Sequence, residues 1–193
     1  MRAADMRCRS ACSSRGFTLI EVLVAILVLA VGLLGLAGLN SKMLNGQFEA
    51  YQRSQALRLV EDMANRIRNN PKVARDGSYG GSEVYGADAQ TCPTSYSVDY
   101  DLCAWNEALR GTEISSGSDS TQKLGSVIGA RGCIENVASG GAGKQTTIRV
   151  TVAWQGLSPT VAPASDCGKG LYGDDDRLRR TASVDVVLGF LGE

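Results

Sequence analysis

The residues from Val22 to Leu39 form one apolar run, VLVAILVLAVGLLGLAGL, that contains no charged side chain. Its 18 residues reach the length of a membrane-spanning helix, about 27 Å at about 1.5 Å per residue. One carboxylate, Glu21, stands directly before the run. An ionisable group in such a segment is costly, and it persists only where the protein uses it. The run and its carboxylate therefore constrain this chain more than any other feature.

The residues before the run indicate how the helix is oriented in a membrane. Residues 1–16 contain four arginines and one aspartate, a net charge of +3, so the remainder of this neutral chain carries −3. By the positive-inside rule, the N-terminus is expected in the cytoplasm and residues 40–193 outside the inner membrane. A cleaved secretory signal peptide or a generic anchor is the alternative, but the apolar core of a signal peptide is usually shorter than this run.

The helical pattern continues beyond the apolar run. No proline occurs before Pro71, and Asn69-Asn70-Pro71 is a credible stop for a helix that begins at Phe17. Over residues 40–70, apolar side chains recur at steps of three and four, which predicts an amphipathic helix with one stripe to bury. The predicted stripe consists of Leu44, Phe48, Tyr51, Leu57, Val60, Met63, Ala64 and Ile67. Gly32, Gly35, Gly38 and Gly46 indicate either close helix packing in lipid or a stretch that bends.

The sequence Gly16-Phe17-Thr18-Leu19-Ile20-Glu21, followed by the apolar helix, resembles the class III signal of type IV pilins and related pseudopilins. The resemblance covers about residues 1–70. It implies that a prepilin peptidase removes residues 1–16 by cutting between Gly16 and Phe17, and that the new amine of Phe17 is then methylated. It also implies that Glu21 acts in assembly, because a buried carboxylate needs a partner such as the Phe17 amine of a neighbouring subunit. A glutamate that stays protonated or reaches the membrane interface is the alternative.

Within this family, the arginine-rich leader and the proline-free run are most similar to PilV-type minor pilins. The resemblance then implies a processed subunit that primes or enters type IV pilus assembly and is finally displayed at the cell surface. Its partners would be the peptidase/methyltransferase, the inner-membrane assembly platform, other minor pilins and the major pilin through the N-terminal helix, and a tip adhesin. A minor pseudopilin of a type II secretion system is the alternative, because it carries the same signal.

Residues 71–193 are expected to form a periplasmic globular α+β domain. The spacing of Leu102, Trp105 and Leu109 predicts a helix over 99–109, and alternating apolar residues predict strands over 127–135, 146–154 and 181–190. Such strands form an antiparallel sheet with one apolar face, and the stripe of the long helix is its natural partner. Residues 71–95 and 111–126 are expected to be loops. Trp105 and Trp154 are expected to be core residues.

Four cysteines follow the apolar helix, at positions 92, 103, 133 and 167, and an exported domain favours two disulfides. Three pairings exist, of which we favour Cys92–Cys103 with Cys133–Cys167; free thiols are the alternative. No CxxC pair is present, so a zinc site is not expected.

Little in the chain indicates catalysis or a cofactor. Histidine is absent, and no pair of carboxylates is placed for acid–base chemistry, so we expect a structural subunit rather than an enzyme. Asp174, Asp175 and Asp176 could suggest calcium, but three consecutive aspartates before arginines are more typical of a solvated turn. The distal region has no net positive charge, so nucleic acid is not an expected partner.

Overall fold

The computed structural model describes residues 16–111, 127–138 and 145–189. The described part contains the helices α1 (Leu19–Asn69), α2 (Pro71–Arg75) and α3 (Val98–Arg110), followed by the strands β1 (Arg131–Ala138), β2 (Thr146–Gln155) and β3 (Arg179–Leu188). The chain divides into two compact units, residues 1–44 and 45–193. The helix α1 begins in the first unit and ends in the second.

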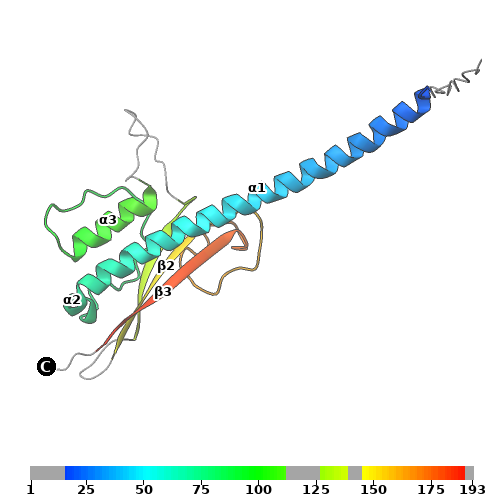
Figure 1. Ribbon diagram of the computed structural model, residues 1–193. Coiled ribbons are helices and arrows are strands. Elements are labelled where there is room, and N and C mark those ends of the chain that lie inside the picture. The colour runs from blue at the N-terminus through cyan, green and yellow to red at the C-terminus, as the bar shows by residue number, and fades with distance from the viewer. Residues whose placement is uncertain (1–15, 112–126, 139–144, 190–193) are drawn as a thin grey trace, which may run out of the picture. The chain divides into compact units, whose positions relative to one another are not determined.

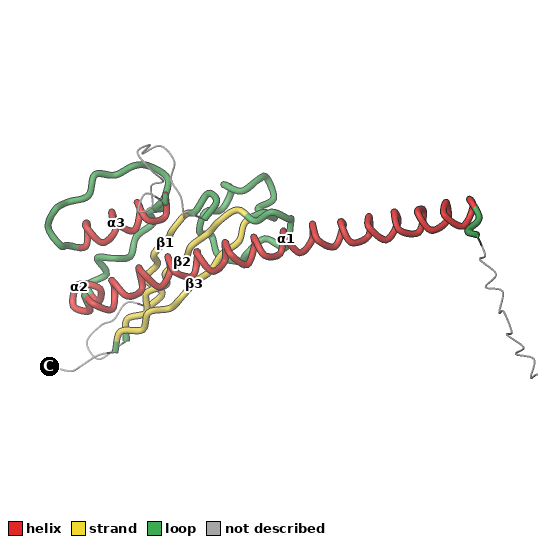
Figure 2. The backbone as a smooth tube through the Cα atoms, turned by 45° about the horizontal axis from the view of Figure 1, so that its top comes forward, coloured by secondary structure: helices red, strands yellow, loops and turns green. Residues whose placement is uncertain are grey.

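In the second unit, a three-stranded antiparallel sheet of order β1-β2-β3 packs against helices on one face. The segment of α1 from Asn45 onward and α3 cover this face (Figures 1 and 2). The predicted α+β architecture, with a long N-terminal helix and an antiparallel sheet, is therefore confirmed. The main core draws Val60 and Ile67 from α1, Trp105 from α3 and Val150 from β2.

The buried stripe of α1 differs from the predicted one. It consists of Gln52, Ala56, Val60, Met63, Ala64 and Ile67. Leu44, Phe48, Tyr51 and Leu57 are instead exposed, at 55%, 41%, 52% and 40%. At about 100° per residue, Phe48 and Leu57 point to either side of the face that meets the sheet, and Tyr51 points away from it. The apolar spacing thus predicted a helix correctly but placed its contact face wrongly at the N-terminal end.

The other helices follow from local sequence. Ser97 caps α3 by accepting the Tyr100 N–H (3.2 Å), and Gly111 ends it in the left-handed conformation (φ 77°). The expectation that all of residues 71–95 form a loop was wrong for α2. Pro71 stands in the first turn of α2, where its fixed φ suits a helix and its missing N–H costs nothing.

The strand β1 begins later than predicted, at Arg131 rather than at residue 127. The Gln52 side chain accepts the Ile128 N–H (3.0 Å), and the Ala130 N–H donates to the Val127 carbonyl (3.2 Å), so residues 127–130 form a turn. Gly132 then lets β1 approach α3, because a Cβ there would lie 2.3 Å from the Trp105 ring. Both tryptophans are buried, as predicted, and the Trp105 indole donates to the Leu59 carbonyl (2.8 Å).

The second face of the sheet is also partly covered, although the sequence predicted only one apolar face. Thr151 and Ala153 are buried on this face. The segment 156–178 supplies the cover through a small second cluster of Cys133, Ala153, Cys167 and Tyr172. The Tyr172 hydroxyl donates to the Gly129 carbonyl (2.7 Å). We call residues 156–178 the covering loop.

Two of the buried tyrosines make stability sensitive to alkaline pH. Burial raises the pKa of Tyr79 to about 12, helped by its hydrogen bond to Asp101, and burial likewise raises the pKa of Tyr172 to about 12. Because the ordinary value is 10.0, the unfolded chain loses these protons first. We expect the free energy of unfolding to be unaffected by them below about pH 10 and to fall from there to about pH 12, by about 1.4 kcal/mol per pH unit per tyrosine.

Chemical denaturation of the full chain in detergent across this pH range measures the loss. Tyr79→Phe should flatten the alkaline decline, and Tyr51→Phe, which changes an exposed tyrosine, should leave it unchanged. An identical slope for the wild-type chain and Tyr79→Phe would contradict the assignment.

Candidate assembly segment

The predicted cleavage position lies just before α1. Gly16, Phe17 and Thr18 precede the first helical residue, Leu19, and the Phe17 side chain is 84% exposed. The rest of the predicted leader, residues 1–15, lies outside the described residues. The Gly16–Phe17 peptide bond is therefore exposed and outside the helix, where a peptidase can reach it.

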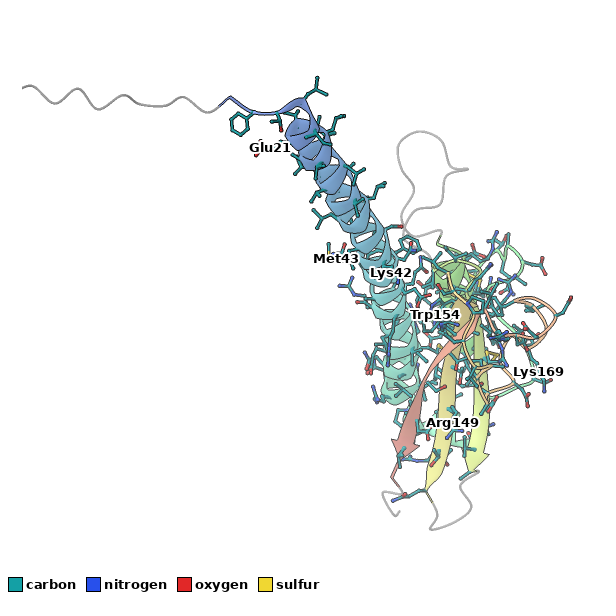
Figure 3. The ribbon with its side chains drawn as sticks, turned by 90° about the vertical axis from the view of Figure 1, so that its right-hand side faces the viewer. Glu21, Lys42, Met43, Arg149, Trp154 and Lys169 are labelled. Carbon is teal, nitrogen blue, oxygen red and sulfur yellow. A yellow bond between two sulfur atoms is a disulfide. The ribbon has the colours of Figure 1, made fainter. Side chains whose placement is uncertain are left out.

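Glu21 lies in the first turn of α1 (Figure 3). The Thr18 carbonyl accepts the N–H groups of Glu21 (3.1 Å) and Val22 (3.4 Å), which starts the helix at this point. A carboxylate in the first turn interacts favourably with the positive end of the helix dipole. No ion pair or hydrogen bond engages the Glu21 side chain within the described part of the chain, so its charge is available to a group from outside.

The apolar residues that follow Glu21 are all exposed. From Val22 to Leu39 the large side chains are between 48% and 73% exposed, and none belongs to a core cluster. Among the described helices, α1 is the one long and apolar enough to cross a membrane, judged by length and composition. A surface of this size must be covered by lipid or by other helices.

The four glycines of α1 have open space around them. A Cβ placed at Gly32, Gly35, Gly38 or Gly46 would meet no atom within 4 Å. Contacts among the described residues therefore do not require glycine at these positions. Small residues on one helix allow a second helix to approach closely, so these glycines are consistent with packing against a partner.

The four distal cysteines form two disulfides, Cys92–Cys103 and Cys133–Cys167, which is the pairing we favoured. The first joins the loop after α2 to α3, and the second joins β1 to the covering loop. Both sulfurs of the second bond belong to buried residues.

The three consecutive aspartates have separate roles. Asp174 and Asp175 are exposed, as expected of a solvated turn, but Asp176 is buried. Its carboxylate accepts the Gly170 N–H (2.9 and 3.0 Å) and lies 3.5 Å from the Arg179 guanidinium. A fully solvated turn was therefore wrong for Asp176. No group of three or more potential metal ligands is present among the described residues.

Sequence patterns did not predict two features of the globular unit. Arg179 is buried at the start of β3, and a pocket lies between α1 and the end of β2. Neither has a local pattern that would reveal it, because the groups involved come from segments far apart in the chain.

The helix and its signal define a class of protein. Residues 12–37 match the family model described as the prokaryotic N-terminal methylation motif. The chain thus carries a type IV pilin-like prepilin signal, and its α+β architecture is consistent with the type IV pilin fold. Together with the one helix in the described part of the chain that is long and apolar enough to cross a membrane, this signal indicates a membrane-anchored, pilin-like structural subunit. No curated protein and no solved structure matches the chain.

Proposed function

We propose that this chain is a PilV-type minor pilin that primes or enters type IV pilus assembly. A prepilin peptidase/methyltransferase cuts after Gly16 and methylates the Phe17 amine. The N-terminus lies in the cytoplasm and the globular unit in the periplasm until the subunit enters a pilus at the cell surface. The observation that carries the proposal is a Glu21 side chain that has no partner among the described residues, in the first turn of an exposed apolar helix.

The chemistry of processing complements Glu21. Cleavage creates a cationic amine at Phe17, about one helical turn from Glu21. When helices bundle, the amine of one subunit can neutralise the carboxylate of the next, which removes the cost of burying either charge alone. The exposed run up to Leu39 then provides the apolar surface that bundles. The subunit then assembles with other minor pilins, the major pilin, the platform and a tip adhesin.

A minor pseudopilin of a type II secretion system is the second candidate, because the signal and the fold are the same in both. The Val22–Leu39 run and the arginine-rich leader resemble those of PilV-type minor pilins, which supports the first candidate, and the missing proline in the run distinguishes the chain from many major pilins. Genes for pilus components beside this one would support the pilus, and genes for secretion components would support the pseudopilus.

Mass spectrometry of sheared filaments tests the proposal directly. A peptide that begins with N-methyl-Phe17 in the filament fraction is expected. Detection of the chain only in membranes, with Met1 intact, would overturn the proposal.

The pairing of charges makes a separate prediction. Glu21→Ala should still insert into the membrane and still be cleaved, because neither step needs the carboxylate. It should enter filaments poorly, at about one tenth of the wild-type level or less, if one charge-assisted contact is lost. Glu61→Ala, which removes an exposed carboxylate of the same helix in the globular unit, is the control for loss of charge alone. Normal incorporation of Glu21→Ala would exclude the pairing.

A further inference from the structure

A pocket of about 280 Å³ lies between α1 and the strand ends of the globular unit. Ala50 and Arg53 of α1 form one wall, and Trp154, Leu157 and Arg180 form much of the remainder. Trp154 lies where the end of β2 meets α1 (Figure 3). Pockets for small molecules usually measure about 300–1,000 Å³. A volume just below this range suits one or two side chains of another protein.

One cation around the pocket, Arg53, has no partner in the described part of the chain. The Glu49 carboxylate, also in the wall, accepts the N–H groups of Leu157 (3.1 Å) and Ser158 (3.3 Å), and it lies 3.5 Å from the Arg180 guanidinium. These three groups satisfy Glu49, and Arg180 in turn is held by it. Arg53 is exposed and makes no ion pair or hydrogen bond within the described part of the chain. The pocket therefore combines an apolar wall with an unpaired guanidinium.

We propose, building on the function proposed above, that this pocket receives a carboxylate side chain and an adjacent apolar side chain from a neighbouring pilin-like subunit. The carboxylate pairs with Arg53, and the apolar group packs on Trp154 and Leu157. Arginine beside an aromatic residue is typical of the few positions that carry most of the binding energy in protein interfaces. A guanidinium also binds a carboxylate through two parallel hydrogen bonds.

The place of the pocket on α1 favours a neighbouring subunit as the occupant. Arg53 lies a few turns after Leu39 on the same helix. Subunits that bundle along residues 17–39 hold the following turns of their helices near one another, so groups on an adjacent subunit reach this level of α1. The charge of Arg53 selects an acidic group among them.

A charge reversal with a matched control tests the pocket. Arg53→Glu should still be cleaved and methylated but should enter filaments about tenfold less, since it loses a charge-assisted contact and adds a repulsion. Arg58→Glu is the control, because Arg58 is also exposed on α1 without a partner in the described structure but does not line the pocket. It should enter filaments within about twofold of the wild-type level. The N-methyl-Phe17 peptide and both disulfide-linked peptides confirm processing and folding of each variant.

Site-specific photo-crosslinking gives a second measurement that does not depend on the charge. A photoreactive amino acid at Leu157, in the pocket wall, should give an adduct with a pilin-like subunit. The same probe at Leu171, an exposed leucine of the covering loop away from the pocket, should give none. If Arg53→Glu enters filaments at the wild-type level, or if both probe positions give equal adducts, the docking role of the pocket would be overturned while the proposed function stays intact. Absence of the wild-type chain from filaments would instead overturn the proposed function.

Discussion

Arg179→Met is expected to lower the free energy of unfolding by about 3–5 kcal/mol, the usual consequence of breaking a buried charged network. The Arg179 side chain is 2% exposed. Its guanidinium donates to the carbonyls of Ser165, Cys167 (2.9 Å) and Pro163 (3.2 Å), and it lies 3.5 Å from the Asp176 carboxylate. Methionine fills similar space but leaves these acceptors without a donor. Because domains are stable by only about 5–15 kcal/mol, the loss is large.

The structural consequence should be local to the covering loop. Arg179 donates to three of its carbonyls, and Asp176 takes up a left-handed conformation (φ 53°) beside it. Without the guanidinium, the carboxylate of Asp176 stays buried and unpaired, so the turn that it stabilises should open. Arg179→Lys keeps the charge but loses the planar set of donors, and its effect should be intermediate.

Denaturation of the full chain in detergent, combined with limited proteolysis of the loop, measures both consequences. Arg177→Met is the matched control, because Arg177 is an exposed neighbour whose ion pair with Asp175 is long, at 3.8 Å. It should change stability by less than about 0.5 kcal/mol. Equal stability of Arg179→Met and Arg177→Met would show that the network is not required.

The second large effect is expected from loss of the Cys133–Cys167 bond. Replacing both cysteines by serine should lower the free energy of unfolding by about 2–4 kcal/mol, and by more than the same change at Cys92 and Cys103. The reason is loop length, since the sequence separations are 34 and 11 residues. The longer loop restricts the unfolded chain more when it is closed. In addition, the serines would place hydroxyls in the buried cluster with Ala153 and Tyr172.

Peptide mapping without reduction comes first, because it establishes that each bond is present in the wild-type chain. Comparison of the two double variants then gives the order of their effects. A greater loss from the Cys92–Cys103 pair would contradict the loop-length argument. The Arg179 and Cys133–Cys167 changes both release the covering loop, so their combined effect should be smaller than the sum.

The two units differ in how much of their structure the sequence predicted. The apolar run, Glu21 and the Gly16–Phe17 junction predicted the helix, its environment and the type of signal, because each depends on residues next to one another in the chain. The strands over 146–154 and 181–190 were also predictable, since alternating apolar and polar residues indicate a strand with one buried face. The observed β2, Thr146–Gln155, is one residue longer than predicted, and β3, Arg179–Leu188, begins and ends two residues earlier; residue 190 lies outside the described residues.

Predictions failed where two distant segments decide the outcome. The spacing of Phe48, Tyr51 and Leu57 is helical, but only the angle at which α1 meets the sheet determines that Gln52 and Ala56 are buried in their place. The turn at 127–130 depends on Gln52, which lies 76 residues away from Ile128. Apolar periodicity contains no information on either contact.

The sequence by itself determined that this chain is anchored by one apolar helix with a prepilin-type signal and continues into an α+β unit. It did so because membrane insertion, helix formation and the signal depend on composition and on short spacing. Only the tertiary structure decided that Arg179 is a buried organiser of the covering loop, and that Glu49 is satisfied while Arg53, in the same pocket as Trp154, has no partner among the described residues. Burial and charge pairing depend on which segments meet, so an arginine that is part of the core and one that is available to a partner look alike until the chain has folded.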